Sequence, residues 1–244
     1  MNLPFEISLY DGILLIDKPA GPTSHDVVDT VRSILGIQRV GHCGTLDPNA
    51  TGLLIVVTGK GTKLSERFTA TDKVYEGAMV LGIETDSYDA DGEVVSTKPV
   101  PPLTTERLNE IAKKFTGDIL QTPPMVSAVK KGGIPLYKLA RKGVDVHRDA
   151  RPIHIYDFTV EEYIQPMAWF RVACSKGTYV RSLVYDFGKE LGCGAHLKHL
   201  RRTVSGKFTV DDAIELEELI KLPPKQLQEK IIPITEVVKI LTLK

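Results

Sequence analysis

The chain has 244 residues, 42% of them hydrophobic, which is enough to bury a sizeable core. Its 31 basic and 31 acidic side chains balance, so the chain as a whole is not a general polyanion binder. It has neither an apolar run near the roughly 20 residues of a membrane span nor a signal-peptide pattern, so we expect a cytoplasmic protein without a membrane partner. The cysteines (Cys43, Cys174 and Cys193) lack the spacing of a zinc cluster or a disulfide framework.

The charge is unevenly distributed along the chain. Residues 121–210 carry fifteen Lys and Arg against seven Asp and Glu, a local excess of eight positive charges. Such asymmetry favours a nucleic-acid-binding face. A solvated surface of mixed charge is the alternative that charge alone leaves open.

The N-terminal part predicts two strands and a helix. Residues 12–17 are an apolar strand, and residues 24–35 form a helix with Ser24 as its N-cap. The β-branched run at 52–57 predicts a strand buried on both faces. Glycines, a proline and an asparagine punctuate residues 39–51, so we expect irregular structure there, with polar side chains held at the edge of a rigid strand.

The middle of the chain predicts a strand at 73–81, in which Lys73 and Tyr75 share one face. A hairpin turn through Asp91 and Gly92 and a helix capped by Thr104 follow. Two ligand motifs fail on spacing. The segment after Gly59 lacks the earlier glycine of a phosphate loop, and the acidic loop lacks the glutamate that closes a calcium loop.

The second half begins with an exposed basic loop at 122–143, in which Pro135 starts a short helix that ends at Gly143. Strands follow at 153–163 and 169–175, and Thr178 caps the next helix. Arg181 falls in the first turn of that helix. A cation is unfavourable at a helix N-terminus, so an anionic partner is expected there.

Five segments resemble, in order, the motifs of the TruB family, which are tRNA pseudouridine synthases acting on uridine 55 of the T-loop. They are GHCGTLDPNATGLL at 41–54, K-x-Y-x-G at 73–77, PPMVSAVKKGG at 123–133, CSKGTYVRSLVYDFG at 174–188 and LRRTVSGKF at 200–208. The resemblance implies the pseudouridine synthase fold, of the α+β class, with a mixed, mainly antiparallel sheet flanked by helices and loops. It implies a catalytic domain at 1–214, and a helical tail at 215–244 in place of a full C-terminal RNA-binding domain of the PUA type.

The resemblance also assigns the catalytic residues. Asp47 is the essential carboxylate, Arg181 the arginine that pairs with it, and Tyr75 the tyrosine that stacks on the target base and assists removal of the C5 proton. Isomerisation of uridine gains no atom or electron, so no cofactor and no metal are expected. A carboxylate lowers the barrier to glycosidic cleavage as a nucleophile or as an anion beside the developing positive ribose.

Further residues are implied as RNA contacts. His42 occupies space left by the flipped base or stacks near it, Leu200 lines the pocket wall, and Lys18 lies near the site. The fourth motif adds Tyr179. The candidates for phosphate contacts are Lys130, Arg141, Arg201, Arg202 and Lys207.

The expected partner is the T-stem-loop of tRNA, bound by a monomer. Two alternatives remain at this stage. The chain could be an RNA-binding or RNA-folding protein in which catalysis is secondary, or a catalytic subunit that requires a guide RNA.

Overall fold

The computed structural model describes residues 8–127, 130–136, 139, 144 and 146–242. The chain divides into two compact units. The first unit contains residues 1–73 and 201–244, and the second contains residues 74–200. Mixed, mainly antiparallel strands flanked by helices make up the structure, so the predicted α+β class is confirmed.

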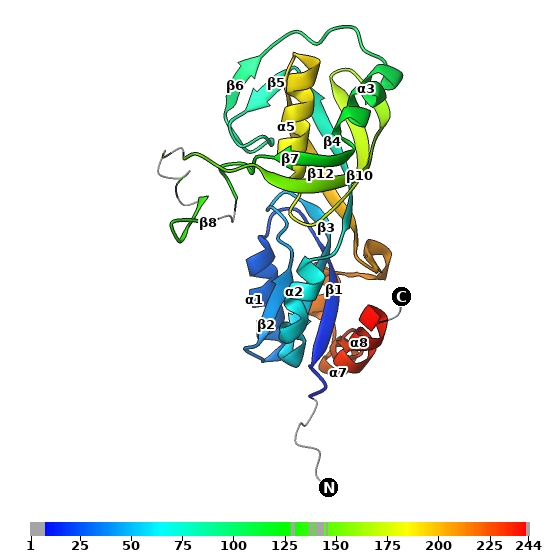
Figure 1. Cartoon of the computed structure of the whole chain (residues 1–244). Coiled ribbons are helices and arrows are strands. Elements are labelled where there is room, and N and C mark those ends of the chain that lie inside the picture. Colours follow the sequence, from blue (N-terminus) through cyan, green and yellow to red (C-terminus); the bar gives the residue numbers. More distant parts are fainter. Residues whose placement is uncertain (1–7, 128–129, 137–138, 140–143, 145, 243–244) are drawn as a thin grey trace. The chain divides into compact units, whose positions relative to one another are not determined.

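The first unit is built on two long antiparallel strands, β1 (Gly12–Lys18) and β3 (Thr51–Thr58), paired from Gly12 opposite Thr58 to Lys18 opposite Gly52 (Figure 1). β3 is buried from its second residue to its last, as predicted. Shorter strands extend the pair. They are β2 (Val40–Cys43), β13 (Phe208–Thr209), β14 (Ile214–Glu215), β15 (Ile232–Pro233) and the last five residues of β12 (Ala195–Ser205).

The core of the first unit lies along these strands. The alternate residues Ile13 and Leu15 of β1 and Leu53, Ile55 and Val57 of β3 are almost completely buried. Around them pack Phe68 of α2 and Phe208 of β13 at 5.9 Å between ring centroids, with Val237 of the C-terminal helix. Burial of these side chains stabilises the scaffold that carries the loop between β2 and β3.

Helix α1 (Ser24–Leu35) begins one residue earlier than a Ser24 cap requires. Thr23 is its N-cap, and a capping box joins Thr23 and Asp26 in both directions. Ser24 instead has its hydroxyl bonded to the backbone of Leu46. The helix ends at Gly36, whose φ of 65° is the left-handed conformation that favours glycine.

Residues 40–43 form strand β2, where irregular structure was expected. Pairing with β3 and burial of Val40 and Cys43 outweigh the turn-forming character of Gly41. The irregular segment therefore starts at Gly44, whose φ is 84°.

The remaining helices of the first unit are short. Gly59–Leu64 is a 3-10 helix (η1) that continues into α2 (Ser65–Thr69). The C-terminal segment is helical, as expected, and also contributes β14 and β15 to the strands on β1. Its helices are η3 (Val210–Asp212), α6 (Leu216–Lys221), α7 (Pro224–Glu229) and α8 (Ile234–Thr242).

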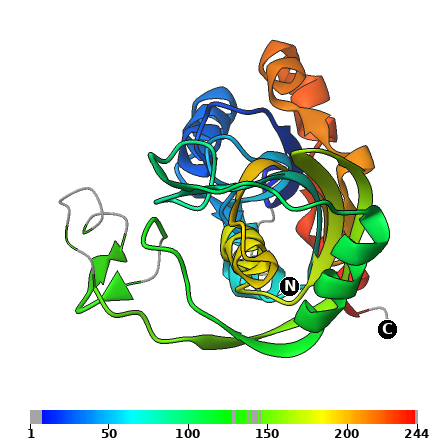
Figure 2. The ribbon, with the colours of Figure 1, turned by 90° about the horizontal axis from the view of Figure 1, so that it is seen from above.

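The second unit has the strand order β12-β4-β11-β10-β7, formed by β4 (Lys73–Leu81), β11 (Met167–Cys174), β10 (Arg151–Ile164) and β7 (Gly117–Gln121) with the start of β12. Helix α3 (Thr105–Ala112), capped by Thr104 and followed by η2 (Lys113–Phe115), packs on β10 (Figures 1 and 2). The predicted hairpin is formed by β5 (Ile83–Thr85) and β6 (Val94–Thr97).

Helix α5 (Val180–Leu191) has Tyr179 at its N-cap, so the expected Thr178 cap is wrong. The Thr178 hydroxyl donates to the carbonyl of Ser175 and is not available to the helix. In the basic loop, β8 (Lys130–Lys131) pairs with β9 (Ile134–Pro135). Most of the helix expected after Pro135 lies outside the described residues.

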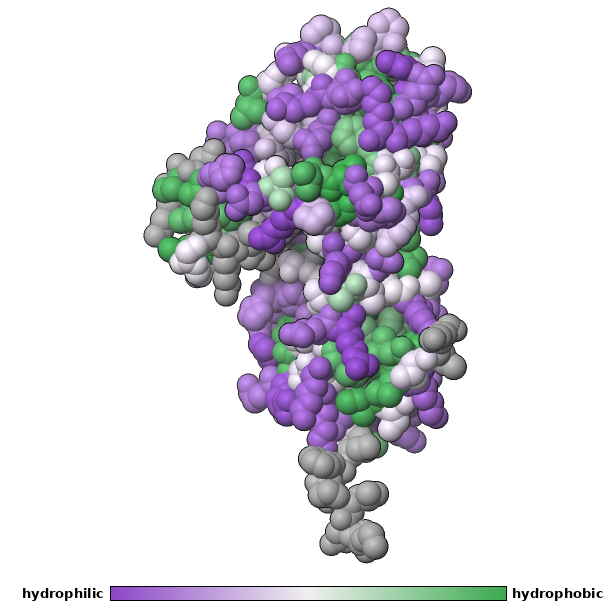
Figure 3. Space-filling model, in the orientation of Figure 1, coloured by the Kyte–Doolittle hydropathy of each residue, from purple (hydrophilic) through white to green (hydrophobic). Residues whose placement is uncertain are grey.

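On the face shown in Figure 3, hydrophilic residues cover most of the surface. Among the described residues, no helix is both long enough and apolar enough to cross a membrane.

Gly52→Ala tests the close approach of β3 and β12. A Cβ at Gly52 would lie 2.3 Å from the carbonyl oxygen of Arg202, and the φ of Gly52 is 97°. We expect the free energy of unfolding to fall by roughly 3 kcal/mol or more. The control is Gly36→Ala, where φ is also positive but no atom lies within 4 Å, with an expected loss of roughly 1 to 2 kcal/mol. Equal losses in urea unfolding would contradict the close approach.

Candidate active site

The loop between β2 and β3 holds Asp47, which is half-buried. The residue before it, Leu46, exchanges two hydrogen bonds with the buried Ser24 hydroxyl, at 2.9 and 3.0 Å. The residue after it, Pro48, offers its carbonyl to the Lys18 ammonium and to the Gly21 N–H, both at 2.9 Å. The backbone on both sides of the Asp47 carboxylate is therefore fixed by groups from β1 and α1 and the turn between them.

Lys18 is completely buried at the end of β1. Its ammonium also donates to the Pro19 carbonyl at 2.7 Å. Burial lowers its pKa to about 8, although the negative charges of Asp47 and Asp26 act in the opposite direction. Lys18 thus lies near the Asp47 carboxylate and bonds the loop backbone.

Arg202 is only 1% exposed. Its Nε donates to the Leu53 carbonyl at 2.7 Å and its Nη2 to the Gly44 carbonyl at 3.0 Å. A buried guanidinium with these partners does not reach solvent, so the expected phosphate contact by Arg202 is wrong. The RR pair in the fifth motif gave no sign that its two arginines differ in burial.

His42 and Cys43 precede the loop on β2. Burial, with the nearby charge of Arg202, lowers the pKa of His42, so the neutral imidazole dominates at pH 7. Its Nδ1 is buried and has no hydrogen-bond partner among the described residues. Burial raises the pKa of Cys43 to about 12, and this thiol is not a nucleophile in the folded chain.

Arg181, in the first turn of α5, is buried and has the anionic partner that its position requires. Its Nη1 lies 3.2 Å from Oδ2 of Asp89 and 3.2 Å from the Ser87 carbonyl. Its Nη2 donates to the Val126 carbonyl at 2.7 Å. The guanidinium is thus held within the second unit by three backbone and side-chain oxygens.

Asp89 is the functional candidate that sequence reasoning missed. The sequence of the acidic loop was interpreted only as a possible calcium loop and as a turn. The position of Arg181 at a helix N-terminus predicted an anionic partner, but did not indicate which carboxylate it is. The loop is strained next to Asp89, because Tyr88 has a φ of 67°. Stacking of Tyr88 on Tyr185 of α5, at 4.0 Å between ring centroids, stabilises this conformation.

The structure describes several of the other residues expected to contact RNA or the target base, and leaves two of them wholly or partly undescribed. Tyr75 lies on β4 and is 9% exposed, and Leu200 is half-buried on β12. Tyr179 exchanges two backbone hydrogen bonds with the Gln121 side chain, at 2.7 and 3.1 Å, which fixes the start of α5. The side chain of Lys130 and the whole of Arg141 lie outside the described residues.

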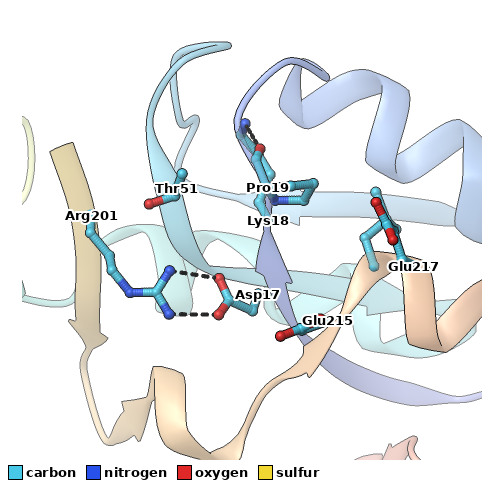
Figure 4. A pocket seen from close by; sticks show the side chains of 8 residues that line it. Asp17, Lys18, Pro19, Thr51, Arg201, Glu215 and Glu217 are labelled. Carbon is cyan, nitrogen blue, oxygen red and sulfur yellow. Dashed lines mark hydrogen bonds and ion pairs between the residues drawn. The ribbon is translucent and has the colours of Figure 1, made fainter. Parts of the chain in front are cut away.

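A pocket of about 300 Å³ opens in the first unit beside β1 (Figure 4). Arg201 points into it and forms two hydrogen bonds with Asp17, at 3.0 and 2.6 Å. Asp17 occupies one N–H of each terminal nitrogen of Arg201, so a phosphate contact by Arg201 would have to use its remaining N–H groups. The described residues that line the pocket include Lys18, Glu215 and Glu217 but not Asp47.

Two solved structures share the fold. A chain of a Cbf5-Nop10-Gar1 complex is 30% identical, with a TM-score of 0.74 over 95% of this chain and 62% of that chain. A chain of an H/ACA RNP bound to a substrate RNA containing 2'-deoxyuridine is 28% identical, with a TM-score of 0.70 over 94% and 61%. This chain therefore spans about three-fifths of those two. The shared fold is that of the pseudouridine synthases, which are isomerases.

The particular family follows from sequence. The profile of the TruB family pseudouridylate synthase N-terminal domain matches residues 32–180, and that of the tRNA pseudouridylate synthase B C-terminal domain matches residues 181–239. Proteins named tRNA pseudouridine synthase B are 50% identical in Opitutus terrae, over 92% of this chain and 93% of that one, and 49% identical in Geotalea uraniireducens, over 85% and 67%. The chain belongs to the TruB family, and the resemblance predicted from its motifs is confirmed.

Lys18→Met tests the burial of the ammonium. Unfolded Lys18 holds its proton up to a pKa near 10.5, whereas the folded residue releases it at about 8. Between these values the unfolded state binds more protons, so the unfolding free energy of the parent should rise with pH relative to the variant, by about 1 to 3 kcal/mol in total. Urea unfolding of both proteins from pH 7 to 10.5 measures this difference. A difference independent of pH would show that Lys18 titrates normally.

Proposed function

We propose that this chain converts uridine 55 in the T-loop of tRNA to pseudouridine, with Asp47 as the essential carboxylate and no cofactor. The observation that carries the proposal is the fixed backbone on both sides of Asp47, within the region that matches the TruB profile. The tRNA substrate is supported by the relatives that are named tRNA pseudouridine synthase B.

The reaction breaks the bond between N1 and the ribose, turns the uracil and rejoins it through C5. The proton that leaves C5 is balanced by the proton that N1 gains, so the product is an isomer of the substrate. Asp47 acts either as a nucleophile or as the anion that stabilises positive charge on the ribose. In both cases a carboxylate that is already in position needs no reorganisation when charge develops.

Arg181 is proposed as the cation that pairs with Asp47 during the reaction. Its guanidinium is oriented before substrate binds, because Asp89 and two backbone carbonyls hold it. A planar fork with several donors can keep these bonds and still offer N–H groups to a second carboxylate. Asp89 is accordingly proposed as a positioning residue for Arg181.

The remaining roles concern the RNA. We assign Tyr75 to stacking on the target base and to assistance in removal of the C5 proton, and neutral His42 to the space that the flipped base leaves. Leu200 and Tyr179 are assigned to the base pocket and its edge, and Lys130 and Arg141 to phosphates. The proposed partner is the T-stem-loop alone, bound by a monomer in the cytoplasm.

The test is incubation of the purified chain with an unmodified tRNA transcript, with and without EDTA. Pseudouridine is then mapped by carbodiimide adducts that stop primer extension. A single T-loop stop in both samples is the expected result. RNA binding without any stop would instead favour a binding protein or a guide-dependent subunit.

Asp47→Asn should reduce single-turnover product formation by roughly 10⁴-fold or more, because the amide is neither nucleophile nor anion. The dissociation constant for the transcript should stay within about tenfold of the parent, since the lost interaction is made mainly in the reaction. Turnover and filter binding measure the two effects separately. Full activity of this variant would rule out the assigned mechanism.

Asp89→Asn should lower the single-turnover rate by roughly 10- to 100-fold, because a misplaced Arg181 no longer meets the reacting groups correctly. RNA affinity should change little. Asp91→Asn is the matched control, since this carboxylate is exposed on the same loop. Equal rates for the two variants would contradict the positioning role of Asp89.

A further inference from the structure

Arg202 has two hydrogen-bond acceptors that lie on opposite sides of Asp47 in the sequence. The Gly44 carbonyl stands at the start of the irregular segment, and the Leu53 carbonyl stands just inside β3. One rigid guanidinium therefore joins the two ends of the segment from residue 44 to residue 53. We call this segment the Asp47 loop.

We propose that Arg202 is a positioning residue that clamps the two ends of the Asp47 loop and so fixes the carboxylate for catalysis. The inference rests on the proposed function in taking Asp47 as the reacting carboxylate. The clamp itself involves only residues of the first unit.

The chemistry of the side chain suits this role. Burying a cation costs free energy that only good hydrogen bonds offset. A buried arginine that does not bind RNA therefore indicates a structural role for the charged group. The two carbonyls are bonded by different nitrogens, Nε and Nη2, which a guanidinium holds in one fixed plane. A lysine at this position would present its three N–H groups from a single nitrogen, which cannot stand where both Nε and Nη2 of Arg202 stand.

The glycines of the loop agree with the clamp. A Cβ at Gly44 would lie 3.3 Å from Nη1 of Arg202, and a Cβ at Gly52 would lie 2.3 Å from the Arg202 carbonyl oxygen. Both residues also have positive φ angles, 84° and 97°. The backbone at each end of the loop thus approaches Arg202 more closely than other residues would allow.

Cys43 offers a readout of the clamp. It is 0% exposed and immediately precedes Gly44, so its thiol becomes accessible when this end of the loop opens. The charge of Arg202 lowers the pKa of this thiol, against the larger effect of burial. Loss of that charge cannot by itself make Cys43 more reactive, and faster labelling of an Arg202 variant therefore reports opening.

The experiment compares Arg202→Lys and Arg202→Met with the parent in the full chain. Iodoacetamide labelling of each cysteine is followed by peptide mass spectrometry, alongside single-turnover rates and RNA affinity. We expect Cys43 to be labelled at least about tenfold faster in both variants, with Cys174 and Cys193 of the second unit unchanged. The single-turnover rate should fall roughly 10- to 100-fold, while the dissociation constant stays within about twofold.

Arg67→Met is the control, because Arg67 is exposed on α2 of the first unit and should change neither readout. If Arg202→Met does not fold, Arg202→Lys keeps the charge and the test. Unchanged Cys43 labelling in a folded variant would overturn the clamp, and an open loop with full turnover would overturn the positioning role. Failure of the proposed function is detected separately, by activity of Asp47→Asn.

Discussion

A carboxylate on an irregular loop is useful for chemistry only if the backbone that carries it cannot move. Here the loop contains little regular structure of its own, and its rigidity comes from side chains outside it. Ser24, Lys18 and Arg202 each saturate a backbone group within a few residues of Asp47. Two of the three are buried cations. The loop carbonyls accept hydrogen bonds from these cations, and the same bonds fix the loop backbone. The neighbouring strands β1 and β3 supply the apolar surroundings in which such bonds are strong.

The same logic applies in the second unit to Arg181. Its place in the first turn of a helix is unfavourable for a cation, and burial increases the cost. Asp89 compensates for this cost, and the residue before it, Tyr88, has a left-handed backbone and stacks on Tyr185. Each unit therefore orients one charged group, Asp47 in the first unit and Arg181 in the second, by contacts that lie wholly within that unit.

Sequence patterns predicted the elements well where burial was periodic. β3 is a continuous apolar run and β4 alternates, and the extents of both strands were recognised within a few residues. The caps were less predictable, because neighbouring hydroxyl residues compete. Thr23 caps α1 while Ser24 bonds Leu46, and the choice depends on tertiary contacts that no local pattern contains. Arg202 and Asp89 were misjudged for a related reason. An arginine among other arginines and an aspartate among other aspartates look like surface residues, and only the fold shows that Arg202 is buried and that Asp89 pairs with Arg181.

The first unit is assembled from both ends of the chain, and this has a consequence for the order of folding. During synthesis residues 1–73 emerge long before residues 201–244. The pairing of β1 with β14 and the hydrogen bond from Arg202 to Gly44 can therefore form only when nearly the whole chain has been translated. The second unit, whose residues are contiguous, can fold in the meantime. Its folding also shortens the effective loop that must close to bring the two ends together. The loop that carries Asp47, the proposed catalytic residue, is thus among the last features of the nascent chain to become ordered, although it lies in the first quarter of the sequence.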